Sequence, residues 1–218
     1  MDLWADFLGN RGRLTNKWAS YFPIYQRHFE RFRNRPFVFI EIGCGEGGSL
    51  QMWRRYFGPF AQIVGLDVRP ECKAFEQPGI QVRIGDQGDD AFLNAVVDEF
   101  GAPGIVLDDG SHLQHHVQST FATLYPRVQQ DGAYMVEDLH TAYWADHGGG
   151  LHAPGSFIQR CKGLVDEING EWTPQKELVT DFTRSTMSMS FYNSVVVFEK
   201  GRLPPSASIM TGAGQPGT

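Results

Sequence analysis

Acidic side chains and a histidine gather in two short segments of this 218-residue chain. The first segment is Asp108-Asp109-Gly110-Ser111-His112 and the second is Glu137-Asp138. Each follows an apolar run, residues 104–107 and 133–136, that is typical of a buried strand. Carboxylates at the carboxyl ends of neighbouring parallel strands meet in the crevice where open α/β sheets bind ligands. The pattern therefore predicts a site that holds a hard cation, Mg²⁺ or Ca²⁺ rather than zinc, and removes a proton.

The two segments suggest different tasks for their side chains. Adjacent residues of an extended chain point in opposite directions, so we expect one of Asp108 and Asp109 to face the cation. Octahedral Mg²⁺ with three protein ligands keeps positions for water or for two vicinal hydroxyls, and a bound hydroxyl loses its proton more easily. His112 is expected at the start of a helix over residues 112–125, whose positive end favours a neutral ring that can accept a proton. A turn with a helix N-cap at Asp109–Ser111 is the structural alternative.

A glycine-rich segment, Glu41-Ile42-Gly43-Cys44-Gly45-Glu46-Gly47-Gly48, lies between an expected strand and an expected helix. Its glycines satisfy the G-x-G-x-x-G pattern of dinucleotide sites, so a dinucleotide stays an alternative ligand, as does a tight turn without any ligand. The carboxylates of Glu41 and Glu46 disfavour a phosphate at the helix N-terminus. They suit a cationic ligand instead, such as a sulfonium compound or its amino group.

Two further strand ends can contribute to the same ligand site. Asp67 ends the second strand, where an acid accepts the two ribose hydroxyls of an adenosine ligand. Gly85-Asp86-Gln87 ends the third strand and can border the adenine ring. Three strand ends in a row therefore carry groups that fit different parts of one nucleoside ligand.

The elements that position these residues alternate along the chain. Apolar runs at 37–42, 63–66, 80–84, 104–107 and 133–136 predict strands, and helical periodicity predicts helices over 48–57, 89–100, 112–125 and 157–168. Such alternation is typical of βαβ units with a parallel sheet. Two final strands, 186–191 and 194–199, are separated by Tyr192-Asn193, which predicts an antiparallel hairpin. We expect an α/β, Rossmann-like fold whose mostly parallel seven-stranded sheet has helices on both faces.

Composition limits the organisation and the partners of the chain. We expect an N-terminal helical or lid segment (1–35), a ligand-binding domain (36–201) and a disordered tail (202–218). The net charge of −6 argues against broad nucleic-acid binding, and no apolar stretch is long enough to span a membrane. Three dispersed cysteines and the lack of a signal-peptide pattern lead us to expect a cytoplasmic protein. The aromatic-rich residues 1–35 are expected to contribute to a homo-oligomer, a dimer or larger.

These motifs together resemble a known enzyme family. The strand ends at Glu41, Asp67 and Asp86 are similar to those of class I S-adenosylmethionine-dependent methyltransferases. Over residues 14–201 the chain resembles the metal-dependent sugar O-methyltransferases of natural-product biosynthesis, which methylate deoxysugar hydroxyls on macrolides. The segments that carry this likeness are Glu41–Gly43, Gly85–Gln87, Asp108–His112, Val136–Thr141 with Tyr143-Trp144, and Phe191-Tyr192 leading into Val195–Lys200.

The resemblance implies a role for each motif residue. Asp109, Glu137 and Asp138 would bind Mg²⁺, and His112 would be the general base. The S-adenosylmethionine site would comprise Thr15, Lys17, Glu41, Gly43, Gly45, Ser49, Asp67, Asp86, Gln87 and Asp108. His140, Tyr143 and Trp144 would shape the acceptor pocket, beside a flexible loop at 145–155. Asn16 departs from the Thr-Asp-Lys segment that is usual in the family, and Cys44 departs from the small apolar residue expected in the loop.

By this resemblance the protein is expected to be an O-methyltransferase that uses S-adenosylmethionine and Mg²⁺. It would transfer a methyl group to a sugar hydroxyl of a glycosylated natural product or saccharide. Two alternatives stay open at this point. One is a catechol-type Mg²⁺-dependent O-methyltransferase, in which a lysine more often serves as the base. The other is a non-catalytic scaffold that binds S-adenosylmethionine or a nucleotide.

Overall fold

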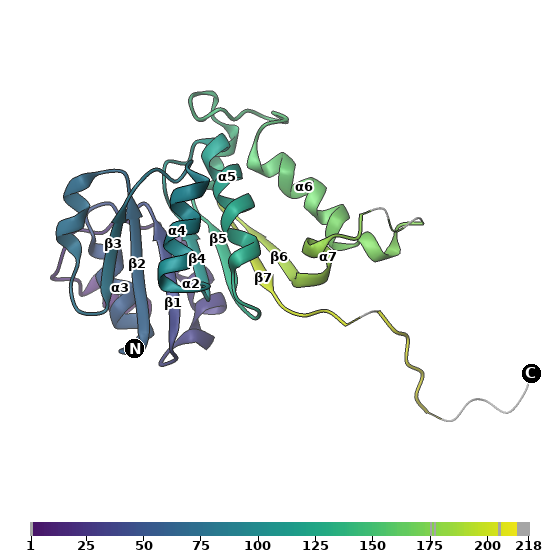
Figure 1. Ribbon diagram of the computed structural model, residues 1–218, viewed down its shortest axis with the longest axis horizontal. Coiled ribbons are helices and arrows are strands. Elements are labelled where there is room, and N and C mark those ends of the chain that lie inside the picture. Colours follow the sequence, from purple (N-terminus) through teal and green to yellow (C-terminus); the bar gives the residue numbers. More distant parts are fainter. Residues whose placement is uncertain (1, 175, 177, 205, 213–218) are drawn as a thin grey trace, which may run out of the picture.

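A seven-stranded sheet organises the chain, whose computed structural model describes residues 2–174, 176, 178–204 and 206–212 (Figure 1). The strand order is β3-β2-β1-β4-β5-β7-β6. The first five strands are parallel, whereas β7 runs antiparallel to both β5 and β6. The strands are β1 (Phe37–Ile42), β2 (Ala61–Asp67), β3 (Ile80–Ile84), β4 (Ile105–Asp108), β5 (Ala133–Val136), β6 (Thr186–Tyr192) and β7 (Val195–Lys200). The expected α/β fold class with its C-terminal antiparallel hairpin is confirmed.

Helices cover both faces of the sheet, which explains why its central strands are apolar throughout. All six residues of β1 are buried, and its five apolar residues are divided between two cores. Phe39 packs with residues of α1, α2 and α3, whereas Ile40 packs with residues of α4, α5 and α6. The helices are α1 (Leu3–Leu8), α2 (Phe22–Phe29), α3 (Gly48–Phe57), α4 (Asp90–Phe100), α5 (Gln114–Leu124), α6 (Phe157–Ile168) and α7 (Asp181–Ser185).

The N-terminal segment is anchored in the first of these cores. Tyr25 and Phe29 of α2 are fully buried, and their rings lie 5.0 and 5.8 Å from that of Trp53 in α3. Residues 10–18 then cross the carboxyl ends of the strands without forming a helix or strand. Within the segment 1–35, which was expected to be helical or to form a lid, α2 is only eight residues long and is flanked by the 3₁₀ turns Ala19–Tyr21 and Glu30–Phe32. The division of the chain at residue 35 stays a prediction.

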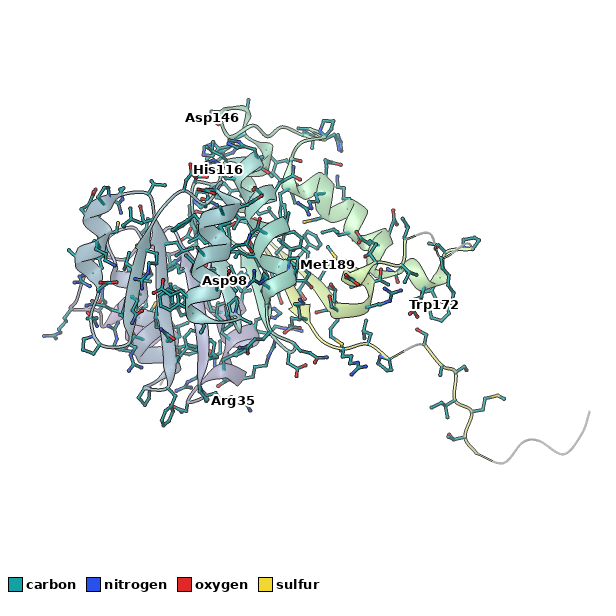
Figure 2. The ribbon with its side chains drawn as sticks, in the orientation of Figure 1. Arg35, Asp98, His116, Asp146, Trp172 and Met189 are labelled. Atoms are coloured by element: carbon teal, nitrogen blue, oxygen red, sulfur yellow. The ribbon has the colours of Figure 1, made fainter. Side chains whose placement is uncertain are left out.

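The carboxyl ends of the parallel strands lie at one end of the molecule. Figure 2 shows Arg35, which precedes β1, and His116 of α5 at opposite ends of the sheet.

The hairpin turn falls at Asn193-Ser194, one residue later than expected, because Ser194 takes the left-handed conformation with φ 69°. Of the expected disordered tail, residues 205 and 213–218 lie outside the described part, and 202–204 and 206–212 form neither helix nor strand. Within the described part of the chain, no helix has the length and apolarity needed to cross a membrane.

Candidate active site

The two acidic segments meet at the carboxyl ends of β4 and β5, which are neighbours in the sheet. Asp109, His112 and Asp138 each contribute one ligand atom to a group whose members lie within 4.8 Å of one another. His112 Nε2 is 3.8 Å from Asp109 Oδ1 and 3.6 Å from Asp138 Oδ2. All three side chains are partly exposed. The placement of Asp109, His112 and Asp138 matches the prediction that the two acidic segments meet, whereas Glu137, the third expected metal ligand, is not a member of this group.

Of the two adjacent acids, Asp109 joins the cluster and Asp108 turns away from it. The Asp108 side chain is buried, where Gln87 Nε2 donates to its Oδ1 at 3.2 Å and the Tyr134 hydroxyl donates to its Oδ2 at 3.4 Å. Burial raises the pKa of Asp108 to about 7. Asp108 thus links the end of β4 to Gln87 at the end of β3.

Lys17 occupies an unexpected place beside this cluster. Its ammonium donates to Asp109 Oδ2 at 2.5 Å and to Glu137 Oε2 at 2.8 Å, and lies 3.5 Å from Glu41 Oε1. Although burial lowers the pKa of Lys17, the carboxylates of Asp109 and Glu137 raise it well above its ordinary value. The hydroxyl of Tyr25 donates to the other oxygen of Glu137, whose pKa burial raises to about 8. Three carboxylates therefore surround one buried ammonium.

Two residues of the cluster have a left-handed backbone, which is unfavourable for side chains other than glycine. His112 has φ 58° and Asp138 has φ 49°. Each such residue costs about 1–2 kcal/mol, and such strain concentrates at functional sites. The expectation that His112 begins a helix is wrong, since α5 starts at Gln114 with Leu113 as its N-cap residue. The left-handed turn at His112 separates the histidine from the helix.

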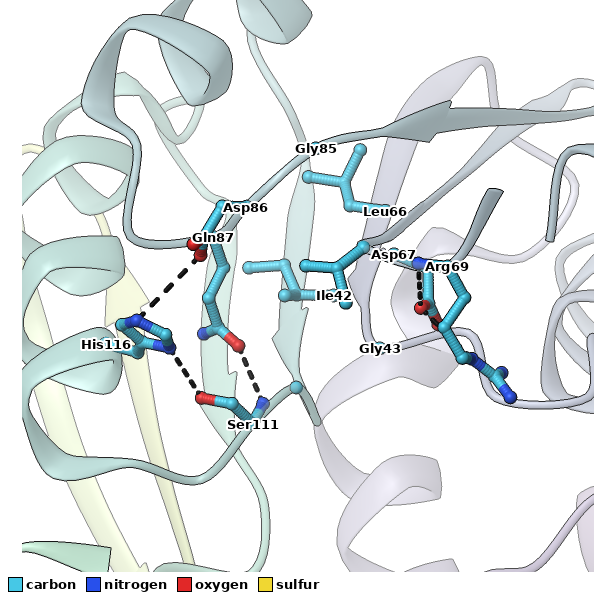
Figure 3. A pocket seen from close by; sticks show the side chains of 12 residues that line it. Ile42, Gly43, Leu66, Asp67, Arg69, Gly85, Asp86, Gln87, Ser111 and His116 are labelled. Carbon is cyan, nitrogen blue, oxygen red and sulfur yellow. Dashed lines mark hydrogen bonds and ion pairs between the residues drawn. The ribbon is translucent and has the colours of Figure 1, made fainter. Parts of the chain in front are cut away.

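A cavity of about 350 Å³ lies beside the ends of β1, β2 and β3 (Figure 3). Its lining includes Gly43, Asp67, Asp86 and Gln87, all four of which were expected to contact the cofactor. Asp67 Oδ1 accepts a hydrogen bond from the backbone nitrogen of Arg69 at 3.0 Å. The chain thus brings the glycine loop and the two further strand ends to one cavity.

The far wall of this cavity was not anticipated from the sequence. Gln87 Oε1 accepts from the backbone nitrogen of Ser111 at 2.7 Å. The hydroxyl of Ser111 lies 2.8 Å from His116 Nδ1, and His116 Nε2 lies 3.8 Å from an oxygen of Asp86 (Figure 3). These contacts tie the loop after β4 to the loop after β3. The sequence showed that residues 108–116 are mostly polar. It did not show that Ser111 and His116 would contact Gln87 and Asp86, which lie 24 and 30 positions away.

A second cavity, of about 190 Å³, shares Gly43 with the lining of the first and also includes Asp109 of the acidic cluster. Its lining holds further residues that were expected at the cofactor: Thr15, Lys17, Gly45 and Ser49. A Cβ atom on Gly43, which has φ 80°, would lie 2.1 Å from the backbone oxygen of Asp109, so only glycine lets the two loops approach this closely.

Glu41 is fully buried next to this second cavity. It accepts hydrogen bonds from the Ser49 hydroxyl at 2.8 Å and from Trp53 Nε1 at 3.2 Å. Burial raises the pKa of Glu41, whereas the ammonium of Lys17 lowers it. Ser49 therefore connects the buried carboxylate of Glu41 to the cavity wall.

A third cavity, of about 340 Å³, is bordered by His140 and Trp144, two of the three residues expected at the acceptor. Tyr143, the third, is 49% exposed. The cavity also includes Trp18 and Tyr21, whose Nε1 and hydroxyl donate to Asp138 Oδ1 at 3.1 and 2.7 Å. The aromatic content of the first 35 residues was the only sequence signal for these two side chains.

Comparison with known proteins identifies relatives of the chain. The chain is 37% identical over 214 residues to an 8-demethyl-8-(2-methoxy-alpha-L-rhamnosyl)-tetracenomycin-C 3'-O-methyltransferase of Streptomyces olivaceus, with 89% of this chain and 54% of the relative covered. It is 36% identical over 197 residues to the mycinamicin VI 2''-O-methyltransferase of Micromonospora griseorubida, with 83% and 48% covered. The chain is a homologue of these sugar O-methyltransferases. It spans about half the length of these curated relatives. No protein-family model matches the chain.

Solved structures confirm the class I methyltransferase fold of this homologue. The MycE methyltransferase of the mycinamycin biosynthetic pathway, in complex with Mg and SAH, aligns with a TM-score of 0.83 and 33% identity. The alignment covers 93% of this chain and 55% of MycE. A second MycE structure, which also contains mycinamycin VI, aligns with a TM-score of 0.81 and 32% identity, covering 94% and 56% of the two chains.

Proposed function

We propose that this chain is an O-methyltransferase that uses S-adenosylmethionine and Mg²⁺ to methylate a sugar hydroxyl of a glycosylated natural product or saccharide. One observation carries the proposal. The Asp109–His112–Asp138 cluster lies between two kinds of cavity. Asp109 lines the second cavity together with the glycine loop, and Asp138 accepts a hydrogen bond from Trp18 in the lining of the aromatic third cavity. The names of the relatives and the Mg and SAH in the MycE structures support the same reaction.

The donor set at the cluster suits Mg²⁺, because hard cations prefer carboxylate oxygens. Of the three expected Mg²⁺ ligands, Asp109 and Glu137 bind the ammonium of Lys17, so their position attracts positive charge. Mg²⁺ would be held by Asp109, Glu137 and Asp138 and would lower the pKa of the acceptor hydroxyl, and S-adenosylmethionine would supply the methyl group. The residues of this chain then have to orient the acceptor, take its proton and hold the methyl donor.

His112 is the proposed proton acceptor. Its Nε2 faces the two carboxylates of Asp109 and Asp138 at 3.8 and 3.6 Å, and these stabilise the positive ring that forms when the proton arrives. Its side chain is 23% exposed, so the ring can reach an acceptor while its backbone is held in place. Trp144 and Trp18 in the third cavity provide flat apolar surfaces that suit the C–H faces of a sugar ring.

The first and second cavities would together hold the methyl donor. Asp67 would accept the ribose hydroxyls, and Asp86 and Gln87 would border the adenine ring. Thr15 and Ser49 line the smaller cavity, which leads to Asp109 and fits the methionine end of the donor. In this order the transferable methyl group would lie beside the cluster, as an in-line transfer requires.

The geometry favours His112 over a lysine base of the catechol type. Lys17 is the lysine at the cluster, but its side chain is 3% exposed and its ammonium donates to two carboxylates. A base must reach the proton that it removes, which Lys17 in this arrangement cannot do. The non-catalytic alternative provides no reason for a strained histidine between two acids.

A direct assay tests the proposal. The purified chain is incubated with S-adenosylmethionine, with Mg²⁺ or with a chelator, and with three acceptors: mycinamicin VI, a rhamnosyl tetracenomycin and a simple catechol. Transfer of one methyl group to a sugar acceptor, detected by mass spectrometry and lost with the chelator, is the expected result. Transfer to the catechol alone would favour the catechol-type enzyme. Binding of S-adenosylmethionine without transfer to any hydroxyl would favour the scaffold.

The setting of the enzyme is part of the same proposal. A homo-oligomer is supported by the exposed aromatic ring of Trp4 in the N-terminal segment, which is 37% accessible. A cytoplasmic location is supported by Cys44, Cys72 and Cys161, which are all free thiols. Light scattering of the purified chain and fractionation of its host cells test these two points.

A further inference from the structure

The hydroxyl of Thr141 lies between the backbones of two proposed site residues. Its Oγ1 is 2.8 Å from the carbonyl oxygen of Asp138 and 3.3 Å from that of His112, so one hydroxyl proton is shared between the two. Thr141 is 4% exposed and therefore does not face an acceptor. Its hydroxyl instead connects the loop that follows β4 with the loop that follows β5.

The residues that Thr141 connects are the two left-handed residues of the cluster. A left-handed residue other than glycine persists only where its surroundings hold it in place. A hydrogen bond to the carbonyl oxygen restrains the orientation of the adjoining peptide group and hence the direction of the side chain. Thr141 therefore supports the directions of His112 and Asp138 at the same time.

Each of the two carbonyl oxygens accepts a further hydrogen bond, that of Asp138 from the backbone nitrogen of Thr141 itself at 3.0 Å and that of His112 from another side chain. Gln114 Nε2 donates to the latter at 3.1 Å, and Gln114 Oε1 accepts from the backbone nitrogen of Phe157 at 2.8 Å. Gln114 thus fixes His112 to the start of α6. The side chains of Gln114 and Thr141 both donate to the carbonyl oxygen of His112. Of these two side chains, only that of Thr141 also donates to the carbonyl oxygen of Asp138.

We propose that Thr141 is a positioning residue, whose hydroxyl fixes the position of the proton acceptor His112 relative to the metal ligand Asp138. The inference rests on the proposed function, because it uses the roles proposed there for these two residues. It predicts that loss of the hydroxyl weakens metal binding and slows transfer together. Loss of the Gln114 amide is expected to slow methyl transfer without weakening metal binding.

Four variants of the full chain test the proposal, with Mn²⁺ as the metal probe and its binding followed by electron paramagnetic resonance. Thr141→Val keeps the shape and removes the hydroxyl, and it should weaken Mn²⁺ binding and lower kcat by ~10–100-fold each, with little change in KM. Thr141→Ser keeps the hydroxyl and should restore most of both. Gln114→Met should lower kcat and leave Mn²⁺ affinity unchanged. Thr123→Val, on the exposed side of α5, is the matched control and should leave both unchanged.

Each outcome of the metal titration supports or overturns the proposal. Mn²⁺ affinity in Thr141→Val equal to that of the wild type overturns it, and so does a Thr141→Ser variant as impaired as Thr141→Val. Equal weakening of Mn²⁺ binding by Gln114→Met shows general loosening of the loops and overturns it too. If Thr141→Val fails to fold, as judged by circular dichroism and S-adenosylhomocysteine binding, Thr141→Ala takes its place.

Failure of this inference is distinguishable from failure of the proposed function. A wild-type chain that methylates no acceptor contradicts the function, while the Mn²⁺ titrations still decide whether Thr141 supports Asp138. A wild-type chain that methylates a sugar, with a Thr141→Val variant that does so at the same kcat, contradicts the role of Thr141 alone.

Discussion

Replacing Lys17 by methionine should destabilise the metal-free protein strongly, because it leaves three buried or partly buried carboxylates without their shared cation. The ammonium lies 2.5, 2.8 and 3.5 Å from oxygens of Asp109, Glu137 and Glu41. At an effective dielectric constant of about 20, one contact at the middle distance has a Coulomb energy of about 6 kcal/mol. Proton uptake by the carboxylates and structural relaxation reduce the net loss, and breaking a buried pair typically costs about 3–5 kcal/mol.

That loss is large for a single chain, whose total stability is typically about 5–15 kcal/mol. For a protein of this size it corresponds to a decrease of about 6–20 °C in Tm. Urea denaturation and thermal scans in the presence of a chelator measure the difference between wild type and Lys17→Met. Added Mg²⁺ should stabilise the variant more than the wild type, because the divalent charge replaces the missing ammonium.

Two further variants give the comparison its controls. Lys17→Arg keeps the positive charge and should lose much less stability than Lys17→Met. Lys73→Met removes a half-exposed ammonium that pairs with Glu76 at 2.9 Å, and it should cost no more than about 1 kcal/mol. Unfolding of Lys17→Met and Lys73→Met at the same urea concentration would contradict the role of Lys17 as the shared cation. So would a Lys17→Met variant that Mg²⁺ stabilises no more than the wild type.

Three other substitutions give separate tests. His112→Ala should lower kcat by about 10²–10⁴-fold while S-adenosylmethionine binding, followed by calorimetry, is kept; full activity would exclude His112 as the base. Gly43→Ala should lower both Tm and cofactor affinity, because its Cβ would lie 2.1 Å from the backbone oxygen of Asp109, and unchanged calorimetric binding would contradict this. Glu199→Gln tests a pH effect: a hydrogen bond from His28, with help from a neighbouring arginine, lowers the pKa of Glu199 to about 2. The stabilisation is therefore present above the unfolded pKa of about 4.3 and is lost as the pH falls through the folded pKa. In urea titrations the variant should be about 1 kcal/mol less stable than the wild type at pH 7 and should match it near pH 2.

Local patterns were sufficient to predict most of the sheet. The apolar runs that became β1 to β5 are long or regular enough to show that both faces of each strand are covered. The short helix α1 was not predicted, since six residues are too few to display a helical period. The hairpin turn was misplaced by one residue because the left-handed conformation of Ser194 has no marker such as glycine in the sequence.

The site was predictable in its members but not in their connections. Asp109, His112 and Asp138 were found from acids that follow apolar runs, since strand ends in a parallel sheet must meet. The place of Lys17 could not be found in this way, because it depends on contacts 92 and 120 positions along the chain. For the same reason the shared hydroxyl of Thr141 became visible only when the loops after β4 and β5 were placed together.

The turn of the final hairpin touches the start of the chain, and this has a consequence for how the protein is made. The hydroxyl of Ser194 lies 2.8 Å from that of Tyr21, 173 positions earlier, and 2.5 Å from His140 Nδ1. During synthesis the five parallel strands emerge well before Ser194 does, so a nascent chain can build most of its sheet while the third cavity still lacks one wall. Contacts of such sequence separation are formed late in folding. Competence to bind an acceptor would then be acquired among the last steps of folding, after the cofactor side of the molecule is already in place.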